Sequence, residues 1–399
     1  MKIAMMTNNY KPFVAGVPVS IERLAGSLRA AGHEVVVFAP SYEGQAAEED
    51  VVRYRALIKG VAGGFSVPDS LDVEIERRFR EGNFDVIHVH HPMMIGTTAR
   101  YLSWKYHVPL VFTYHTRYEQ YLHYIGLSRL KRIMPAYIRS YTKHCDIVIA
   151  PTPVMKDYLE QIQPGADVRV LPTGIPGESF FPDGEKALLL RKKLAGDKKY
   201  LFCTVARLAK EKNLGFLLRC MKIRKEACGS DFKLAFIGDG PMRAALEQEA
   251  EKMGIGEEIV FVGKVPNEEI KNYCRAADLF LFSSLSETQG IVLLESMAAG
   301  TPVLAVRGTG TEDVVVNGMN GYMTDVSEMG FADKLMDILE KKEIDLLRQG
   351  ALLTARNYSC EEIARQAALV YAQAAYNRKG RDRMKYGNRN RRKDMVYSG

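Results

Sequence analysis

Two glutamates, Glu287 and Glu295, stand on either side of a predicted helix start at about Gly290. The helix follows a short apolar segment, 279–282, that is typical of a buried strand. Free N–H groups at Gly290 and Ile291, together with the helix dipole, would attract a pyrophosphate. Glu295 could then accept hydrogen bonds from ribose hydroxyls, and Glu287 would face a transferred group. Capping or solvation explains most isolated glutamates, but this pair in a strand–loop–helix context favours nucleotide binding.

A second group of candidate residues follows the predicted strand 201–206. Arg207 and Lys212 lie in a strand-to-helix loop, where two cations can neutralise a departing diphosphate. A guanidinium binds two phosphate oxygens in a fixed fork, and an ammonium adds a point charge. For either residue alone, a surface charge pair is the better explanation. Gly238 lies in a glycine turn after the next predicted strand, and beside the other two features it indicates part of a nucleotide pocket.

The first half of the chain offers His115 and Gly16. His115 ends the apolar segment 110–114, and this position at a strand end favours an active-site role over that of a buried structural histidine. Gly16 would permit close backbone approach to a phosphate or sugar, although a plain turn glycine is the alternative. Three further histidines, at positions 88, 90 and 91, have no carboxylate or cysteine at ligand spacing. They indicate strand-end packing and loop residues rather than a metal site.

Short apolar segments alternate with helical patterns along most of the chain, which is the signature of parallel sheets with crossover helices. The predicted strands are 2–7, 34–39, 86–89, 110–114, 147–150, 168–171, 201–206, 233–237, 259–262, 279–282 and 303–306. Turn-forming residues at 172–177 predict a linker. We therefore expect an α/β fold with two doubly wound, Rossmann-like domains facing across a cleft. The expected domains are 1–172, completed by a C-terminal helix 362–376, and 173–361, with a disordered basic tail at 377–399.

Composition and charge narrow the class of protein. The net charge of +7 over 399 residues resides entirely in the segment 377–399, which holds nine basic and two acidic residues, so the body is neutral. Such a tail suits an anionic surface or simply aids solubility. There is no apolar run long enough to span a membrane, and the N-terminus predicts a strand rather than a signal peptide. The six cysteines are scattered, so we expect neither disulfides nor structural zinc. We therefore expect the protein in a reducing cytoplasm.

Three motifs give the chain a family resemblance. The E-x7-E motif of Glu287 and Glu295 resembles that of the retaining family 4 glycosyltransferases with the GT-B fold, and the resemblance extends from residue 1 to about 376. The motifs H-T-x-x-E-x-Y-x-H-Y-I, from His115, and G-V-x-x-S-I, from Gly16, are similar to those of bacterial diacylglycerol glucosyltransferases. The resemblance implies that Arg207 and Lys212 hold the diphosphate. It also implies that Glu287 contacts the donor sugar, Glu295 the ribose and His115 the reacting sugar. Gly16-Val17 departs from the double glycine of many relatives, as does the segment 307–312.

The resemblance implies transfer of a hexose, with UDP-glucose as the expected donor, to a lipid such as 1,2-diacylglycerol, giving an alpha-glycolipid. No covalently bound cofactor is expected. A requirement for Mg²⁺ is left open, but the sequence has no D-x-D motif to hold the ion. The basic segment 117–143 and the tail 378–393 would bind an anionic membrane, which places the protein on the inner face of the cell membrane. No nucleic-acid partner is expected.

Several alternatives stay open. One is a GDP-mannose-dependent, phosphatidylinositol-type mannosyltransferase, and another is transfer to a soluble acceptor. A nucleotide-sugar 2-epimerase would share the architecture but need no acceptor. A dinucleotide-dependent dehydrogenase is disfavoured because the first strand–turn–helix lacks the G-x-G-x-x-G fingerprint.

Overall fold

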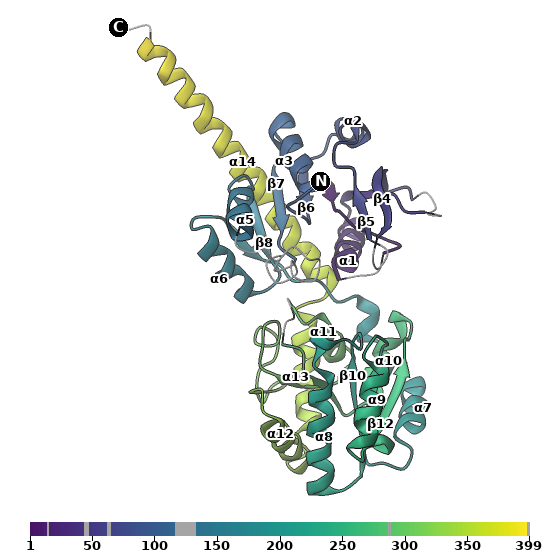
Figure 1. Cartoon of the computed structure of the whole chain (residues 1–399). Coiled ribbons are helices and arrows are strands. Elements are labelled where there is room, and N and C mark those ends of the chain that lie inside the picture. Colours follow the sequence, from purple (N-terminus) through teal and green to yellow (C-terminus); the bar gives the residue numbers. More distant parts are fainter. Residues whose placement is uncertain are drawn as a thin grey trace. The chain divides into compact units, whose positions relative to one another are not determined.

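A computed structural model describes residues 1–13, 16–43, 48–61, 65–115, 133–285, 287 and 289–396. The chain divides into two compact units (Figure 1). Unit 1 comprises Met1–Gly174 and Cys360–Gly399, and unit 2 comprises Ile175–Ser359. Within the described ranges, no helix is both long enough and apolar enough to cross a membrane.

Unit 1 is built on a seven-stranded parallel sheet with the strand order β3-β2-β1-β6-β7-β8-β9. Its strands are β1 (Lys2–Met6), β2 (Glu34–Pro40), β3 (Val51–Tyr54), β6 (Val86–Val89), β7 (Leu110–Thr113), β8 (Ile147–Ala150) and β9 (Val168–Val170). A separate antiparallel pair is formed by β4 (Ala56–Val61) and β5 (Phe65–Pro68). The helices are α1 (Gly16–Ala30), α2 (Val73–Gly82), α3 (Ile95–Tyr106), α5 (Met134–Thr142), α6 (Pro153–Ile162) and α14 (Cys360–Val396).

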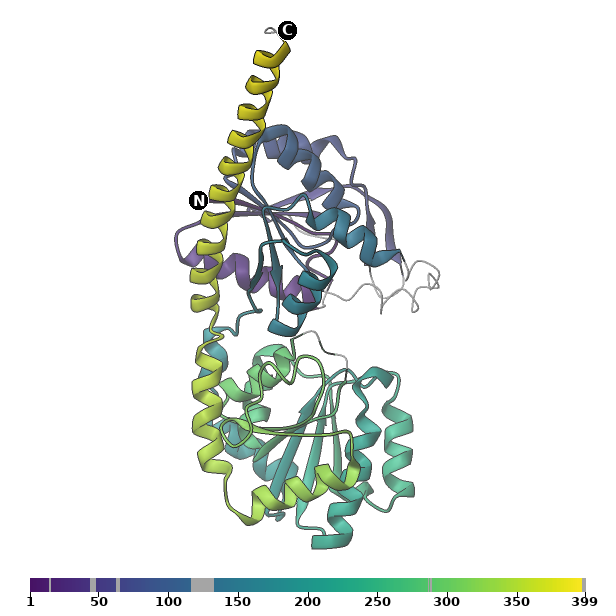
Figure 2. The ribbon, with the colours of Figure 1, turned by 90° about the vertical axis from the view of Figure 1, so that its left-hand side faces the viewer.

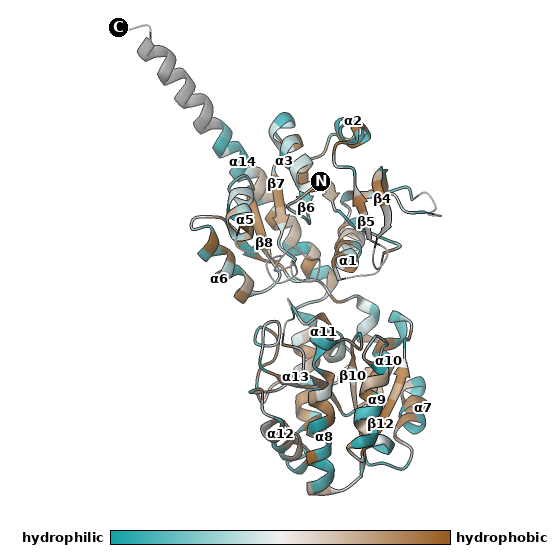
Figure 3. Cartoon of the chain, viewed as in Figure 1, coloured by the Kyte–Doolittle hydropathy of each residue, from teal (hydrophilic) through white to brown (hydrophobic). Residues whose placement is uncertain are grey.

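Both faces of this sheet are buried, because successive side chains of a strand point to opposite sides. In β1, Ile3 and Met5 belong to the core beneath α1 and α14, whereas Ala4 and Met6 belong to the core beneath α2, α3, α5 and α6. Burial on both sides explains why β7 and β8 are hydrophobic along their length (Figure 3). Local signals set the helix ends. Thr152 caps α6 by accepting a hydrogen bond from the Met155 N–H at 3.3 Å.

Unit 2 contains a six-stranded parallel sheet with the order β12-β11-β10-β13-β14-β15. Its strands are β10 (Tyr200–Val205), β11 (Phe232–Ile237), β12 (Ile259–Gly263), β13 (Leu279–Phe282), β14 (Val303–Val306) and β15 (Gly321–Thr324). Its helices are α7 (Gly184–Ala195), α8 (Leu214–Cys228), α9 (Arg243–Lys252), α10 (Ile270–Ala276), α11 (Ile291–Ala298), α12 (Glu328–Glu340) and α13 (Ile344–Arg356). Residues of α7, α10 and α11 pack on one face, and residues of α8, α9 and α12 pack on the other.

The doubly wound α/β fold agrees with the sequence prediction, and every predicted strand is present with small shifts at its ends. Four strands were not predicted, namely β3, β4, β5 and β15. β3 and β15 are edge strands whose residues are mostly only partly buried, so their apolar pattern is weak. The two units separate at Gly174–Ile175 and again at Ser359–Cys360, close to the linker expected at 172–177.

Helix α14 extends further than expected. It packs against α1 in the unit 1 core through Ala367, Tyr371 and neighbouring residues, and it runs along unit 1 (Figure 2). The helix ends at Val396 and so includes most of the segment from 377, for which the sequence predicts a disordered basic tail. Polar side chains at the start of this segment find acceptors in unit 1. The Asn377 side chain donates to the Asp167 carboxylate at 3.1 Å, and Arg381 forms an ion pair with the buried Asp146.

Candidate active site

Four loops meet at the carboxyl edge of the unit 2 sheet, because the strands are parallel and all end on the same side. These loops span 206–213 after β10, 238–242 after β11, 283–290 after β13 and 307–314 after β14, with residues 286 and 288 outside the described set. Arg207, Lys212, Gly238, Glu287 and Gly290 all lie in them. The remaining unit 2 candidates, Ile291 and Glu295, lie on α11, which begins directly after the third loop.

The loops after β10 and β11 are joined through their backbones. The Leu208 N–H donates to the Asp239 carbonyl at 3.0 Å, and the Met242 N–H donates to the Leu208 carbonyl at 2.9 Å. Gly238 has φ +132°, and a Cβ on it would lie 2.0 Å from the Ala206 carbonyl oxygen. Only glycine fits this approach, so Gly238 serves to pack the second loop directly against the first. The adjacent Arg207 is exposed and pairs with no acidic residue in the described part of the chain, which leaves its guanidinium accessible to an anion.

The loops after β10 and β13 are joined by charge and by buried hydroxyl groups. The Lys212 ammonium forms an ion pair with the Glu287 carboxylate, and their side chains are 25% and 22% exposed. The buried Ser283 hydroxyl donates to the Lys212 carbonyl at 3.0 Å and so fixes the backbone that carries the ammonium. This pair is partly buried, so either charge is unfavourable without a partner and needs a new one when the pair separates. An incoming diphosphate for Lys212 and sugar hydroxyls for Glu287 are suitable replacements.

The start of α11 is formed by two glycines in close contact. Gly290 has φ +66° and precedes the first residue of the helix, Ile291. Gly310, in the loop after β14, has φ +82°, and a Cβ on it would lie 3.0 Å from the Glu287 Cβ and 3.1 Å from the Gly290 nitrogen. The first N–H groups of a helix have no acceptor within the helix, so Gly290 and Ile291 can offer theirs to an anion. Glu295 lies partly buried about one turn further along α11.

Sequence reasoning missed two contributors to this arrangement, Ser283 and Gly310. The glycine-rich segment 308–310 was noted only as a departure from a family pattern. Its position directly after a predicted strand was the available signal for Gly310, since the other candidate loops were found by that same signal.

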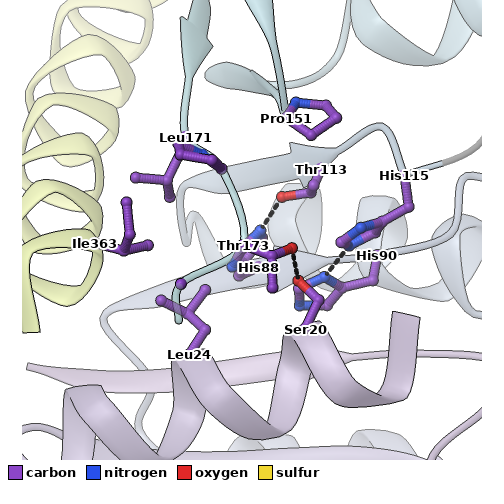
Figure 4. Close-up of a pocket in the computed structure, with 12 residues that line it drawn as sticks. Ser20, Leu24, His88, His90, Thr113, His115, Pro151, Leu171, Thr173 and Ile363 are labelled. Carbon is purple, nitrogen blue, oxygen red and sulfur yellow. Dashed lines mark hydrogen bonds between the residues drawn. The ribbon is translucent and has the colours of Figure 1, made fainter. Parts of the chain in front are cut away.

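The carboxyl edge of the unit 1 sheet carries a cluster of histidines (Figure 4). His115, just after β7, lies with its Nε2 2.8 Å from Nδ1 of His90, which follows β6. His88 lies with its Nδ1 2.8 Å from the hydroxyl of Tyr371 on α14 and its Nε2 2.6 Å from the Thr113 hydroxyl. His88 thus packs as the sequence indicated, whereas His90 is bonded directly to the predicted site residue.

These histidines are neutral at physiological pH. Burial lowers the pKa of both His88 and His115 to about 3 and that of His91 to about 4. Burial also lowers the pKa of His90 well below its usual range, and the neighbouring histidines add to this effect. Nδ1 of His91 accepts a hydrogen bond from the Asn8 N–H at 3.2 Å. A neutral imidazole has one donor and one acceptor nitrogen, so this edge can bind hydroxyl groups without carrying charge.

Gly16 is the first residue of α1 in unit 1, and the space that a Cβ would occupy there is open. Its predicted contact with a phosphate or sugar stays a prediction. The predicted basic segment 117–143 lies largely outside the described residues, which resume at 133. Its described part includes Arg139 and Lys143, both exposed at or near the end of α5. In the described part of the chain, no cluster of three or more histidine, cysteine, aspartate or glutamate side chains could hold a metal ion.

Comparison with known proteins finds a matching family model for each of the two units. A family model described as Glycosyltransferase Family 4 matches residues 14–178, and one described as Glycosyl transferases group 1 matches residues 186–349. The alpha-monoglucosyldiacylglycerol synthase of Streptococcus pneumoniae is 32% identical over 326 residues, which are 76% of this chain and 71% of that protein. A GDP-mannose-dependent alpha-mannosyltransferase of Corynebacterium glutamicum is 27% identical over 335 residues, which are 82% of this chain and 77% of that protein.

The fold has close counterparts among solved structures. Anabaena HepE, solved in complex with UDP, superposes with a TM-score of 0.74 at 17% sequence identity, covering 93% of this chain and all of that one. At this identity the likeness concerns the fold alone, and it agrees with the two Rossmann-like sheets described above. The chain therefore belongs to glycosyltransferase family 4, has the GT-B fold, and is a glycosyltransferase.

Proposed function

We propose that this enzyme transfers a hexose, with retention of configuration, from a nucleotide-sugar to the hydroxyl of a membrane lipid. UDP-glucose is the proposed donor and 1,2-diacylglycerol the proposed acceptor, so that the product is an alpha-glucosyl lipid. The similarity to the alpha-monoglucosyldiacylglycerol synthase of Streptococcus pneumoniae supports a glucosyl group and a diacylglycerol acceptor.

The observation that carries the proposal is the arrangement of charge at the carboxyl edge of the unit 2 sheet. Lys212 and Glu287 hold each other there, next to the accessible guanidinium of Arg207 and the free N–H groups at the start of α11. A donor would exchange this internal pair for two external ones, with the diphosphate on Lys212 and sugar hydroxyls on Glu287. Glu295 is assigned to the ribose.

The same groups suit the chemistry of glycosyl transfer. The transition state carries positive charge on the sugar and negative charge on the leaving phosphate. Arg207, Lys212 and the N–H groups of Gly290 and Ile291 would stabilise the phosphate charge as it develops. On a front-face route the leaving phosphate accepts the proton of the acceptor hydroxyl, so no protein nucleophile is required. Neutral His115 is assigned to hydrogen bonding with the transferred sugar.

Membrane association is the second part of the proposal. The exposed cations Arg139 and Lys143 at the end of α5, and Lys379 in the tail, belong to the two basic segments, 117–143 and 378–393, that would bind an anionic lipid surface. Co-sedimentation with anionic and with neutral liposomes, at low and at high salt, tests this. Binding that prefers anionic vesicles and weakens with salt supports the idea, whereas equal binding to both contradicts it.

The decisive experiment for function incubates the full chain with UDP-glucose, other UDP-sugars or GDP-mannose and with diacylglycerol micelles, followed by mass spectrometry of the lipid. A glucosylated lipid formed from UDP-glucose is the expected product. A mannosylated lipid would support the alternative donor, which the Corynebacterium glutamicum relative makes the second candidate. An isomerised nucleotide-sugar formed without any acceptor would indicate an epimerase, and no product with any donor would overturn the proposal.

A further inference from the structure

His90 occupies an unusual position for a histidine that merely packs. Its side chain is almost fully buried, with 1% of the residue exposed. Its ring lies between two other imidazoles, with centroid distances of 4.2 Å to His88 and 5.1 Å to His115. Nδ1 of His90 is bonded to Nε2 of His115, whereas its Nε2 is buried without a hydrogen-bond partner among the described residues. A buried polar atom left in this state is costly and calls for an explanation.

A cavity that His90 helps to line supplies one. A small cavity of about 20 Å³ is lined by His88, His90 and His115 together with Ser20 and Thr173, whose hydroxyls are 2.9 Å apart (Figure 4). That volume admits about one water molecule. A water there would have the Ser20 and Thr173 hydroxyls as polar partners and could satisfy Nε2 of His90. The ring of His90 would then be held at both nitrogens.

The hydrogen bond between the two histidines determines which ring nitrogen of His115 is available to a substrate. Because Nε2 of His115 is already engaged by His90, Nδ1 is the ring nitrogen left for a substrate. The two neutral rings also share a single proton in their bond. If His90 donates, Nδ1 of His115 carries a hydrogen and acts as a donor, and if His115 donates, its Nδ1 acts as an acceptor.

We infer that His90 is a positioning residue, which orients His115 and fixes its tautomer so that Nδ1 faces the substrate. The inference rests on the proposed function, in which His115 contacts the transferred sugar. His90 itself is buried behind His115 and touches no substrate. Its contribution is the fixed geometry that a reacting group needs, since a displacement of about 1 Å can reduce turnover by about 100-fold.

The test is a set of variants at positions 90 and 115 of the full chain. His90→Leu keeps the volume but removes the hydrogen bond, whereas His90→Asn keeps an amide near the position of Nδ1. We expect His90→Leu to lower kcat by about 10- to 100-fold with little change in the donor KM, and His90→Asn to recover most of the loss. In the His115→Ala background, His90→Leu should have no further effect, because the residue it positions is gone.

The outcomes separate the inference from the function it rests on. An equal loss from His90→Leu in both backgrounds, or a His90→Asn variant as poor as His90→Leu, would show a merely structural role and overturn the inference alone. Normal turnover by His115→Ala would remove the assigned role of His115, and the inference with it. Lipid product from the unmodified chain would still support the transferase activity in that case.

A spectroscopic measurement reports the orientation directly. In the full chain labelled with ¹⁵N-histidine, we expect the two ring nitrogens of His115 to show the widely separated shifts of one fixed tautomer at neutral pH. The His90→Leu variant should bring these shifts toward the averaged values of a free imidazole. Averaged shifts already present in the unmodified chain would overturn the inference. Thermal unfolding of each variant checks that the fold is intact.

Discussion

Gly310→Ala tests whether the loop after β14 holds the site residues in place. The substitution carries two costs. A residue other than glycine at φ +82° is disfavoured by about 1 to 2 kcal/mol. The new Cβ would also lie 3.0 Å from the Glu287 Cβ and 3.1 Å from the Gly290 nitrogen, so both must shift by a few tenths of an ångström. These atoms belong to Glu287, whose carboxylate is proposed to bind the sugar, and to the start of α11. We therefore expect kcat/KM for the donor to fall by roughly 10- to 100-fold.

Gly254→Ala is the matched control in the same unit. Gly254 has φ +70°, and a Cβ there meets nothing within 4 Å, so it bears the backbone cost without touching the site. Urea unfolding should show the backbone loss of unfolding free energy in both variants and an added loss from the close contacts in Gly310→Ala, whereas donor kinetics should be impaired only in Gly310→Ala. If the two variants show the same kcat/KM, the contact between Gly310 and the Glu287 loop has no functional importance and the reasoning is refuted.

Three further predictions concern charge, pH and the C-terminal helix. Arg207→Ala and Glu287→Ala should each fold normally and lose transfer by orders of magnitude, and near-normal lipid product by mass spectrometry would contradict the assignments. Because burial lowers the pKa of His88 to about 3 and the unfolded side chain titrates near 6.5, the unfolded chain binds a proton at pH 5 that the folded chain does not. Each such histidine therefore contributes its full stabilisation above about pH 7, and the free energy of unfolding should fall by about 2 kcal/mol per histidine between pH 7 and pH 5. A free energy of unfolding that stays constant over this range would contradict this. Asp146→Asn should weaken the ion pair with Arg381 and speed amide hydrogen exchange in α14 near Arg381. Unchanged exchange, measured by mass spectrometry, would show that this ion pair does not hold the helix in place.

The strands in the sheet interior could be predicted because they are buried on both faces and form continuous apolar runs, as in 147–150 and 279–282. The candidate site residues of unit 2 could also be placed at one edge of its sheet, since each lies beyond the end of such a run. The ion pair between Lys212 and Glu287 could not be predicted from the sequence. It depends on β10 and β13 being neighbours in the sheet although they are far apart in the chain, and the order of strands in a parallel sheet is decided by tertiary packing.

The role of His90 escaped sequence reasoning for a related reason. Its bond to His115 depends on the register of β6 and β7, which pairs Val89 with Phe112 and so brings the two strand ends together. A histidine in or directly after an apolar strand is equally compatible with packing, as His88 within β6 demonstrates. The contacts of Arg381 could not be predicted either, because its partner Asp146 lies more than two hundred positions earlier in the sequence.

Three aspartates have a structural role that distinguishes them from the candidate site acid Glu287. Asp85, Asp146 and Asp278 each stand directly before a strand. Their carboxylates accept hydrogen bonds, at 2.7 to 2.9 Å, from N–H groups at the start of the neighbouring strands, namely those of Lys2, Leu110 and Leu201 respectively. These N–H groups lie at the amino edge of a sheet, where the ladder would otherwise leave them unpaired. Glu287, by contrast, follows a strand. These three acids thus complete the amino edge of a sheet, whereas the acid proposed to contact the sugar lies beyond the carboxyl end of β13.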